Sequence, residues 1–187
     1  PIVAHNILQS CEILAAAAAE ADVIVLYAQT EAGSGGRGIA CFVVDGRRGG
    51  FRRQPAFALT GQHAIGTGGF SLDGYRANDD EMLQPPGRAF KSALNSINGA
   101  RCYIAAMCNG MVGEALRVAL AYGQSRRSFG KPLADHQGWR WRLADASTEL
   151  QAGRLLVAQA AARVESGTDA QLAAAQAKLY CTRMAER

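Results

Sequence analysis

The 187-residue sequence has few charged residues, few histidines and no paired cysteine motif. Charged side chains make up 19% of the chain and the formal net charge is only +4, which does not indicate a nucleic-acid-binding surface. Cysteines form no C-x-x-C pair, and with three histidines no zinc-ligand spacing can be assembled. We therefore predict no metal site, free thiols in a reducing compartment and, for the mild positive charge, a small anionic ligand.

The sequence also lacks a segment that we interpret as a membrane span or a secretory signal. The stretch ILAAAAA (residues 13–19) is short, has no basic flank and is followed by Glu20 and Asp22. The chain opens with Pro1 instead of a methionine, and no glycine or proline ends the helical pattern of its last residues. We expect a longer natural protein, truncated here at both ends.

Apolar residues make up 49% of the chain, enough for a real core, and their spacing changes near residue 85. From Asp22 to about Leu83, the apolar stretches DVIVLYA, GIACFVVD and GFSLDG alternate with glycine-rich segments. This pattern predicts a β-sheet. The glycine-rich stretches GSGGRG and GTGGF lack the strand–glycine–helix context of a dinucleotide fingerprint, and we interpret them as β-turns.

After residue 87, apolar residues recur three or four positions apart, which predicts a helix to about Ser125. Such a helix spans on the order of 50 Å and must cross a bundle or reach a neighbouring subunit. Asp135 is a plausible N-cap of a second helix that ends before Gly167, and Thr168 or Asp169 begins a third. Three glycines of the first helix permit close helix contacts at some cost in stability, namely Gly99, Gly110 and Gly113.

The segment RRSFGKPLADHQ (residues 126–137) connects the two longest predicted helices and has two interpretations. Basic side chains at a helix C-terminus are stabilised by the helix dipole, so the segment can be a structural joint. Alternatively, an arginine, a hydroxyl, backbone N–H groups at the next helix start and an aromatic ring suit a pyrophosphate with a planar ring nearby. In that case Ser128 would donate a hydrogen bond and Phe129 would pack against the ligand.

The longer stretch YGQSRRSFGKPLADHQ closely resembles the helix-turn-helix signature Y-x-x-x-R-x-[ST]-F-G-K-x-[LI]-x-x-x-Q of the acyl-CoA dehydrogenase family. The likeness extends over nearly the whole chain, through RGIACFVVDGRRGGF and the spacing of Gly61, Thr67 and Leu72 on one side and WRLADASTELQAGRLL on the other. The resemblance implies an α+β fold. Residues 1–84 would form a small middle β-domain with a β-barrel-like sheet, and residues 85–187 part of an antiparallel helical bundle.

The resemblance also implies a function, FAD-dependent α,β-dehydrogenation of an acyl-CoA thioester in fatty acid metabolism. The implied enzyme is a homotetramer or homodimer that passes electrons to an electron-transferring flavoprotein, in the cytoplasm or, in a eukaryote, in the mitochondrial matrix. Arg126 would contact the flavin pyrophosphate of a neighbouring protomer, and Ser128, Phe129 and Gln137 would line the same cofactor. Arg101 is placed beside the acyl-CoA pocket, although a structural salt bridge would equally explain a charge on the apolar stripe.

Several positions depart from the family pattern. One of the two family positions for the catalytic glutamate is Ala100 here, and the other lies downstream of this chain, so no catalytic base can be named. Leu14, Ala15 and Ala16 replace residues that pack on the flavin ring, whereas His63 and His136 are expected to have surface or capping roles. A non-catalytic paralogue that serves as a scaffold or binding subunit, and a flavin monooxygenase or oxidase, therefore stay open as alternatives.

Overall fold

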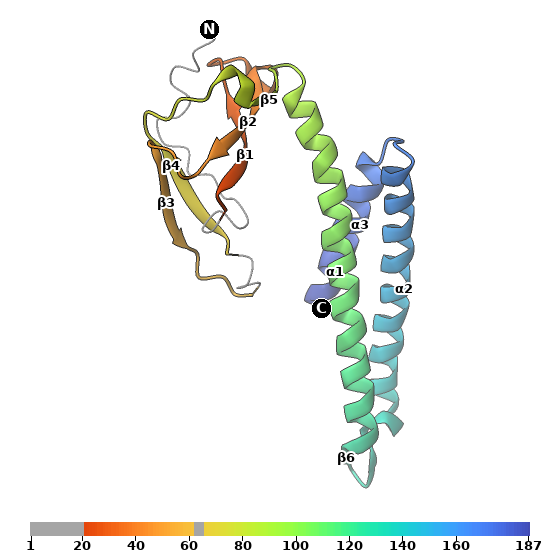
Figure 1. Ribbon diagram of the computed structural model, residues 1–187. Coiled ribbons are helices and arrows are strands. Elements are labelled where there is room, and N and C mark those ends of the chain that lie inside the picture. The colour runs from red at the N-terminus through yellow and green to blue at the C-terminus, as the bar shows by residue number, and fades with distance from the viewer. Residues whose placement is uncertain (1–20, 62–65) are drawn as a thin grey trace. The chain divides into compact units, whose positions relative to one another are not determined.

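The computed structural model describes residues 21–61 and 66–187 (Figure 1). The chain divides into two compact units, residues 1–93 and residues 94–187. Small antiparallel sheets make up most of the first unit, and helices make up the second. The predicted α+β class is confirmed.

Five strands form two sheets in the described part of the first unit. The strands β1 (Val23–Gln29), β2 (Ile39–Asp45) and β5 (Met82–Gln84) form an antiparallel sheet in the order β1-β2-β5. A second sheet pairs β3 (Phe51–Ala56) with β4 (Gly68–Leu72). The three predicted apolar strands correspond to β1, β2 and β4 and are confirmed, whereas β3 and β5 were not predicted.

The glycine-rich stretches differ from the prediction that both are β-turns. In the first, Gly35–Gly38 form a short 3-10 helix, preceded by Gly33 at a φ of 77°. In the second, Gly68 and Gly69 belong to β4, and a Cβ at Gly69 would lie 2.5 Å from the side-chain oxygen of Gln54. The prediction of a turn was wrong there because these two glycines continue the antiparallel pairing of β4 with β3.

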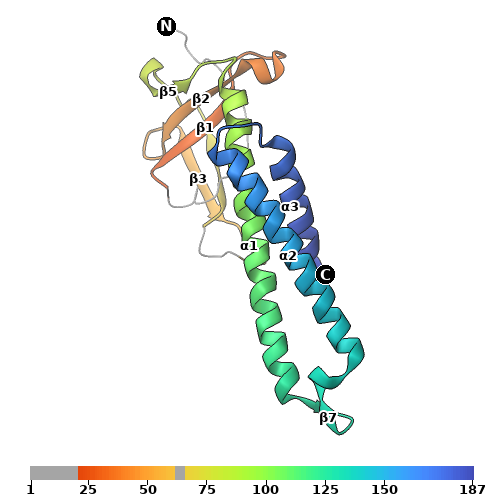
Figure 2. The same cartoon turned by 90° about the vertical axis from the view of Figure 1, so that its right-hand side faces the viewer.

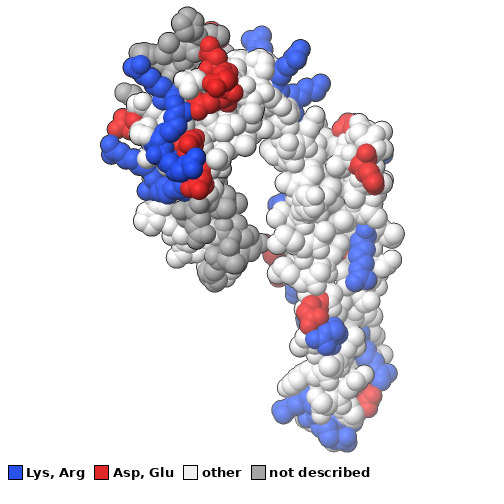
Figure 3. Space-filling model, in the orientation of Figure 1, with Lys and Arg blue, Asp and Glu red and all other residues white. Residues whose placement is uncertain are grey.

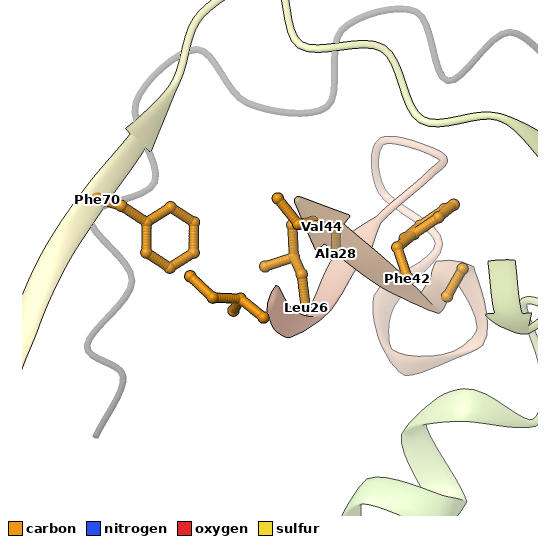
Figure 4. Packing of buried hydrophobic residues seen from close by; sticks show 7 residues of the cluster. Leu26, Ala28, Phe42, Val44 and Phe70 are labelled. Atoms are coloured by element: carbon orange, nitrogen blue, oxygen red, sulfur yellow. The ribbon is translucent and has the colours of Figure 1, made fainter. Parts of the chain in front are cut away.

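The core of the first unit is built from alternate residues of β1 and β2 together with one residue of β4 (Figure 4). Along β1 every second side chain is buried, as expected for a strand with one face toward the core. Phe70 is fully buried and its ring stacks on that of Phe51 at a centroid distance of 4.9 Å. Burial of a phenylalanine side chain of this kind contributes about 1.5–3 kcal/mol, so Phe70 is a principal contact between strands of the two sheets.

The second unit consists of helices that run antiparallel to their neighbours in sequence (Figures 1 and 2). The helix α1 (Ala89–Ser125) begins at the end of the first unit and is followed by α2 (Gln137–Glu165) and α3 (Gln171–Glu186). At 1.5 Å per residue, α1 is about 55 Å long. The predicted long helix is confirmed.

The helix termini differ by about one residue from the prediction. His136 is the N-cap of α2, and Asp135 instead pairs with Arg140 at 3.1 Å, so the assignment of Asp135 as N-cap was wrong. Ala170 is the N-cap of α3, although the Asp169 carboxylate accepts a hydrogen bond from the first backbone N–H of that helix. Gly167, at a φ of 68°, follows the end of α2 as predicted.

Two glycines bring the helices into close contact. A Cβ at Gly123 would lie 2.2 Å from the Trp139 ring, and a Cβ at Gly153 would lie 2.5 Å from the side-chain oxygen of Asn109. By contrast, described atoms leave open space around Gly99 and Gly110. The close contacts that these two glycines permit are therefore not made by the described residues.

The helix α1 leaves many large apolar side chains exposed. Side chains of the predicted apolar stripe are 39–64% exposed, namely those of Phe90, Leu94, Ile97, Ile104, Met111, Val118 and Tyr122. The sequence interpretation finds no membrane span, yet α1 is long and apolar enough to cross a membrane by length and composition alone; core helices of soluble proteins meet the same criteria. The helices α2 and α3 therefore leave this face of α1 uncovered, and an exposed apolar face of this size is typical of a contact surface.

Candidate functional site

The connection between α1 and α2, residues 126–136 and called the connecting turn below, is a compact β-hairpin followed by one 3-10 turn. Arg127–Ser128 (β6) pair antiparallel with Lys131–Pro132 (β7). Two residues join these strands, Phe129 at a φ of 50° and Gly130 at a φ of 78°. Two successive positive φ angles are typical of a type I′ hairpin. The backbone N–H of Leu133 donates to the Arg126 carbonyl at 2.7 Å and closes the turn.

Phe129 combines backbone strain with exposure. It is the one residue other than glycine with a positive φ among the described residues. A left-handed conformation costs a residue with a Cβ about 1–2 kcal/mol, and for a bulky side chain it is a genuine outlier. The side chain is 96% exposed, so burial does not compensate. Strain of this kind concentrates at functional sites.

His136 connects the start of α2 to the hairpin. Its Nε2 lies 3.0 Å from the Ser128 carbonyl oxygen, and its ring meets that of Phe129 edge-on at a centroid distance of 6.3 Å. Its side chain makes no capping bond to α2. His136 is thus the N-cap residue of α2, but its ring contacts the hairpin and does not cap the helix.

The predicted cofactor-binding residues lie on and beside this hairpin. Arg126 follows the last residue of α1, Ser128 ends β6, and Gln137 is the first residue of α2. The side chains of these three residues make no hydrogen bond or ion pair with any described residue. Their polar groups are therefore available to a ligand.

The charge at this end of the helical unit is positive, and Figure 3 shows Lys and Arg side chains gathered there. Asp135 is the one acid between residues 126 and 140, and Arg140 already pairs with it. The guanidinium of Arg127 donates to the Gly130 carbonyl at 2.6 Å. Arg126 remains as an arginine whose charge and donors are not engaged by any described residue, which suits an anion.

Arg101 is half-buried on α1 and donates to the side-chain oxygen of Asn98 at 3.2 Å. Within residues 21–61 and 66–187 no carboxylate pairs with it. The adjacent Ala100 is exposed and offers no acid or base. The structure therefore gives Arg101 an amide partner and leaves its charge unneutralised within the described chain.

The other concentration of charge, on the β-sheet unit, consists of residues that neutralise one another (Figure 3). Arg47 pairs with Asp45 at 3.0 Å, and this hydrogen bond lowers the pKa of the Asp45 carboxyl to about 2. Arg48 stacks on the Tyr75 ring at 5.0 Å and pairs with Glu81. Because Arg47 and Arg48 each have a carboxylate partner, this cluster fits a structural role better than an anion-binding one.

Four residues singled out in the sequence have no described position, whereas four cysteines do have one. Leu14, Ala15, Ala16 and His63 lie outside the described residues. In the part of the chain that is described, no group of three or more His, Cys, Asp or Glu residues could hold a metal ion, and Cys41, Cys102, Cys108 and Cys181 are free thiols. Burial raises the pKa of the Cys181 thiol and that of Cys102, which makes both poor nucleophiles.

Sequence reasoning missed the contacts that hold the connecting turn. Trp139 packs against Gly123, and the Arg140 side chain donates to the Ala134 carbonyl at 2.6 Å. A glycine near the end of one helix and a tryptophan in the first turn of the next were the available signal. The pairing itself requires knowledge of how the two helices cross.

Comparison with known proteins gives consistent matches. A family model described as the acyl-CoA dehydrogenase C-terminal domain matches residues 87–187. The chain is 33% identical to a probable short/branched chain specific acyl-CoA dehydrogenase of Dictyostelium discoideum, over 91% of the chain and 41% of that protein. It is 32% identical to the glutaryl-CoA dehydrogenase of Desulfococcus multivorans, over 98% of the chain and 49% of that protein.

A solved structure, that of butyryl-CoA dehydrogenase from Megasphaera elsdenii, matches with a TM-score of 0.83 at 30% identity. The match covers 88% of this chain and 43% of that one. The chain thus spans less than half the length of each of these three proteins.

Proposed function

Because the chain belongs to the acyl-CoA dehydrogenase family, we propose that it is part of an FAD-dependent oxidoreductase that introduces a double bond between the α and β carbons of an acyl-CoA thioester. The observation that carries the proposal is the connecting turn, where Arg126, Ser128 and Gln137 have no partner among the described residues and Phe129 is exposed. We place the protein in fatty acid metabolism, in the cytoplasm or, in a eukaryote, in the mitochondrial matrix. Residues 1–84 are its middle domain and residues 85–187 its helical domain.

The chemistry of the connecting turn fits FAD. The Arg126 guanidinium would bind the pyrophosphate, because planar guanidinium donors match phosphate oxygens. Ser128 and Gln137 supply a hydroxyl and an amide for hydrogen bonds, and the Phe129 ring offers an apolar surface for a flat ring system. Bound FAD would supply the electron acceptor of the oxidation, and these residues of the chain would bind and orient it.

Arg101 supports the substrate side of the proposal. A half-buried guanidinium without a carboxylate partner is costly unless an anion or a polar ligand approaches it. We assign Arg101 to the acyl-CoA pocket on this ground. Ala100 beside it cannot remove a proton, so it cannot serve as the catalytic base of the proposed reaction.

An assembly of several subunits completes the proposal. The exposed apolar face of α1 needs a cover, and the connecting turn presents ligand-binding groups away from its own helices. Symmetric homo-oligomers provide such covers, with the same surface of each subunit in contact. We propose a homodimer or homotetramer in which the connecting turn of one subunit binds the FAD of its neighbour, and an electron-transferring flavoprotein as the redox partner.

Replacement of Arg126 by alanine tests the cofactor site. Loss of a charge-assisted hydrogen bond to phosphate should raise the dissociation constant of FAD roughly 10- to 100-fold. The measurement is the visible flavin absorption that remains after the protein is saturated with FAD and freed of unbound cofactor. Arg117→Ala is the matched control, because Arg117 is an exposed arginine on α1 that pairs with Glu114 and lies outside the turn. Equal flavin retention in both variants would contradict the assignment.

A second candidate function is a scaffold or binding subunit without catalysis, and the observation that favours it is Ala100 at one of the two positions for the base. The same absorption measurement separates the two functions. A folded wild-type protein that retains no flavin would support the scaffold function. Retained flavin together with turnover of any acyl-CoA would exclude it, and consumption of oxygen in place of a dye acceptor would indicate an oxidase or monooxygenase.

A further inference from the structure

We propose that His136 is a positioning residue that holds the connecting turn in the conformation in which Arg126, Ser128 and Phe129 face the cofactor. This inference rests on the proposed function, because it takes the turn to be the FAD-binding element. It assigns to His136 a task that neither capping of α2 nor a surface location would provide. Three observations carry it: one hydrogen bond, one ring contact and the position of His136 in the chain.

The hydrogen bond fixes the orientation of the imidazole. The Ser128 carbonyl oxygen can only accept a hydrogen bond, so the His136 Nε2 at 3.0 Å carries the proton and donates it. This bond joins the first residue before α2 to the last residue of β6, eight positions earlier. It therefore ties the hairpin to a rigid helix start.

The ring contact acts on the strained residue of the hairpin. Phe129 is 96% exposed, and the His136 ring is the one aromatic partner that its ring has among the described residues. The edge-on geometry, with an interplanar angle of 69°, is a favourable arrangement for two aromatic rings. The same imidazole thus holds the Ser128 backbone on one side and the Phe129 ring on the other.

The position of His136 explains why its ring is available for this task. As the N-cap of α2, His136 has an extended backbone with a φ of −85° and a ψ of 124°, and its side chain makes no capping bond. The preferred N-cap residues use their side chains to bind the helix N–H groups. Here the side chain contacts the hairpin instead of the helix N–H groups. We infer that the residue at this position serves the conformation of the turn and not the capping of α2.

Three substitutions separate the contributions of the imidazole. His136→Gln keeps an N–H donor near the position of Nε2, His136→Phe keeps an aromatic ring without the donor, and His136→Ala removes both. Arg117→Gln, which breaks an exposed pair on α1, is the control for loss of one surface contact. Each variant is purified as the wild-type protein is, and thermal unfolding identifies any variant that fails to fold.

The first readout needs no flavin. Amide hydrogen exchange of Leu133, whose N–H closes the connecting turn onto the Arg126 carbonyl, should accelerate about 3- to 10-fold in His136→Phe. It should return to within about twofold of wild type in His136→Gln. Unchanged exchange in both His136→Phe and His136→Ala would overturn the inference.

The second readout is the dissociation constant of FAD. We expect it to rise about 3- to 10-fold in His136→Phe, more in His136→Ala, and to recover in His136→Gln. If the wild type binds FAD and His136→Phe binds it with equal affinity, the inference about His136 is overturned and the proposed function is not. A folded wild-type protein without affinity for FAD would overturn the proposed function, and the exchange experiment would still decide whether His136 holds the turn.

Discussion

Replacing Phe129 with asparagine should stabilise the protein while weakening the proposed cofactor site. Phe129 occupies the first central position of a type I′ hairpin with a φ of 50°. Asparagine is preferred at that position, because its short polar side chain tolerates the left-handed conformation. The phenylalanine side chain is 96% exposed, so its removal costs almost no buried apolar area.

The expected gain follows from two opposing contributions. Relief of the left-handed strain is worth about 1–2 kcal/mol, and loss of the edge-on contact with His136 removes about 0.5–1.5 kcal/mol at most. Because the contact is exposed to solvent, the lower part of that range applies. The net stabilisation should be about 0.5–1 kcal/mol, which corresponds to a rise in Tm of roughly 1–4 °C for a chain of this length.

Chemical denaturation and thermal unfolding measure the stability of Phe129→Asn, and flavin retention measures its function. Phe129→Leu is the control, since it keeps the strain and removes the aromatic ring. We expect weaker FAD binding in both variants, by roughly 3- to 10-fold, but a stability gain in Phe129→Asn alone. A clear loss of stability in Phe129→Asn would refute the reasoning, because it would mean that the ring, and not the backbone, decides the energy of the turn.

Two further predictions concern the packing and the charges. Gly123→Ala should destabilise the helical unit by about 1–3 kcal/mol in urea denaturation, because its Cβ would lie 2.2 Å from the Trp139 ring, whereas Gly110→Ala, in open space, should stabilise it by about 0.5–1 kcal/mol. The pKa of the Asp45 carboxyl is lowered from 3.8 to about 2 by Arg47, so this pair should contribute to stability above about pH 4 and lose that contribution as the pH falls toward 2. Asp45→Asn should flatten this part of an acid-unfolding curve, and an unchanged curve would argue against the pair.

The strands and helices that the sequence predicts are those with a clear apolar period. Buried residues alternate along β1, and apolar residues recur three or four positions apart along α1. Such a period is stronger evidence for a strand or a helix than the propensities of the single residues. The strand β3, with the sequence FRRQPA, was missed because it contains two arginines, a glutamine and a proline, and only Phe51 marks its inward face. The strand β5 has three residues, too few to establish a period.

The close helix contacts could not be predicted because they depend on residues far apart in sequence. Gly99 and Gly123 lie in the same helix. A Cβ added at Gly99 would meet no described atom within 4 Å, whereas one added at Gly123 would meet the ring of Trp139 from the next helix. Gly153 is similar, with Asn109 as its neighbour. A glycine in a helical sequence therefore predicts that a close contact is permitted, and only the crossing of the helices decides whether it is made.

The candidate site was partly predictable for the opposite reason. Its residues form one contiguous segment, so a motif locates Arg126, Ser128 and Phe129 without knowledge of the fold. The contact of His136 with the hairpin was not predictable, because its hydrogen-bond partner is a backbone carbonyl, which every residue possesses and no sequence pattern marks. The sequence also does not show that the Arg126 side chain has no partner among the described residues, because Asp135 is close enough in sequence to pair with it. In the structure Asp135 pairs with Arg140 instead.

The choice of phenylalanine at position 129 is the strongest physical argument that the connecting turn serves a ligand. A hairpin of two strands with two residues each gains little stability from the hydrogen bonds between its strands. The following Gly130 already provides one of the two positive φ angles of the turn. If folding alone determined the sequence, asparagine or glycine would occupy position 129, since either relieves the strain and exposes less apolar surface. A bulky ring that is strained, exposed and in edge-on contact with a histidine contributes nothing comparable to stability. Its cost is explained if the ring contacts something outside the chain, and a flat cofactor next to the unpaired Arg126 accounts for both residues at once.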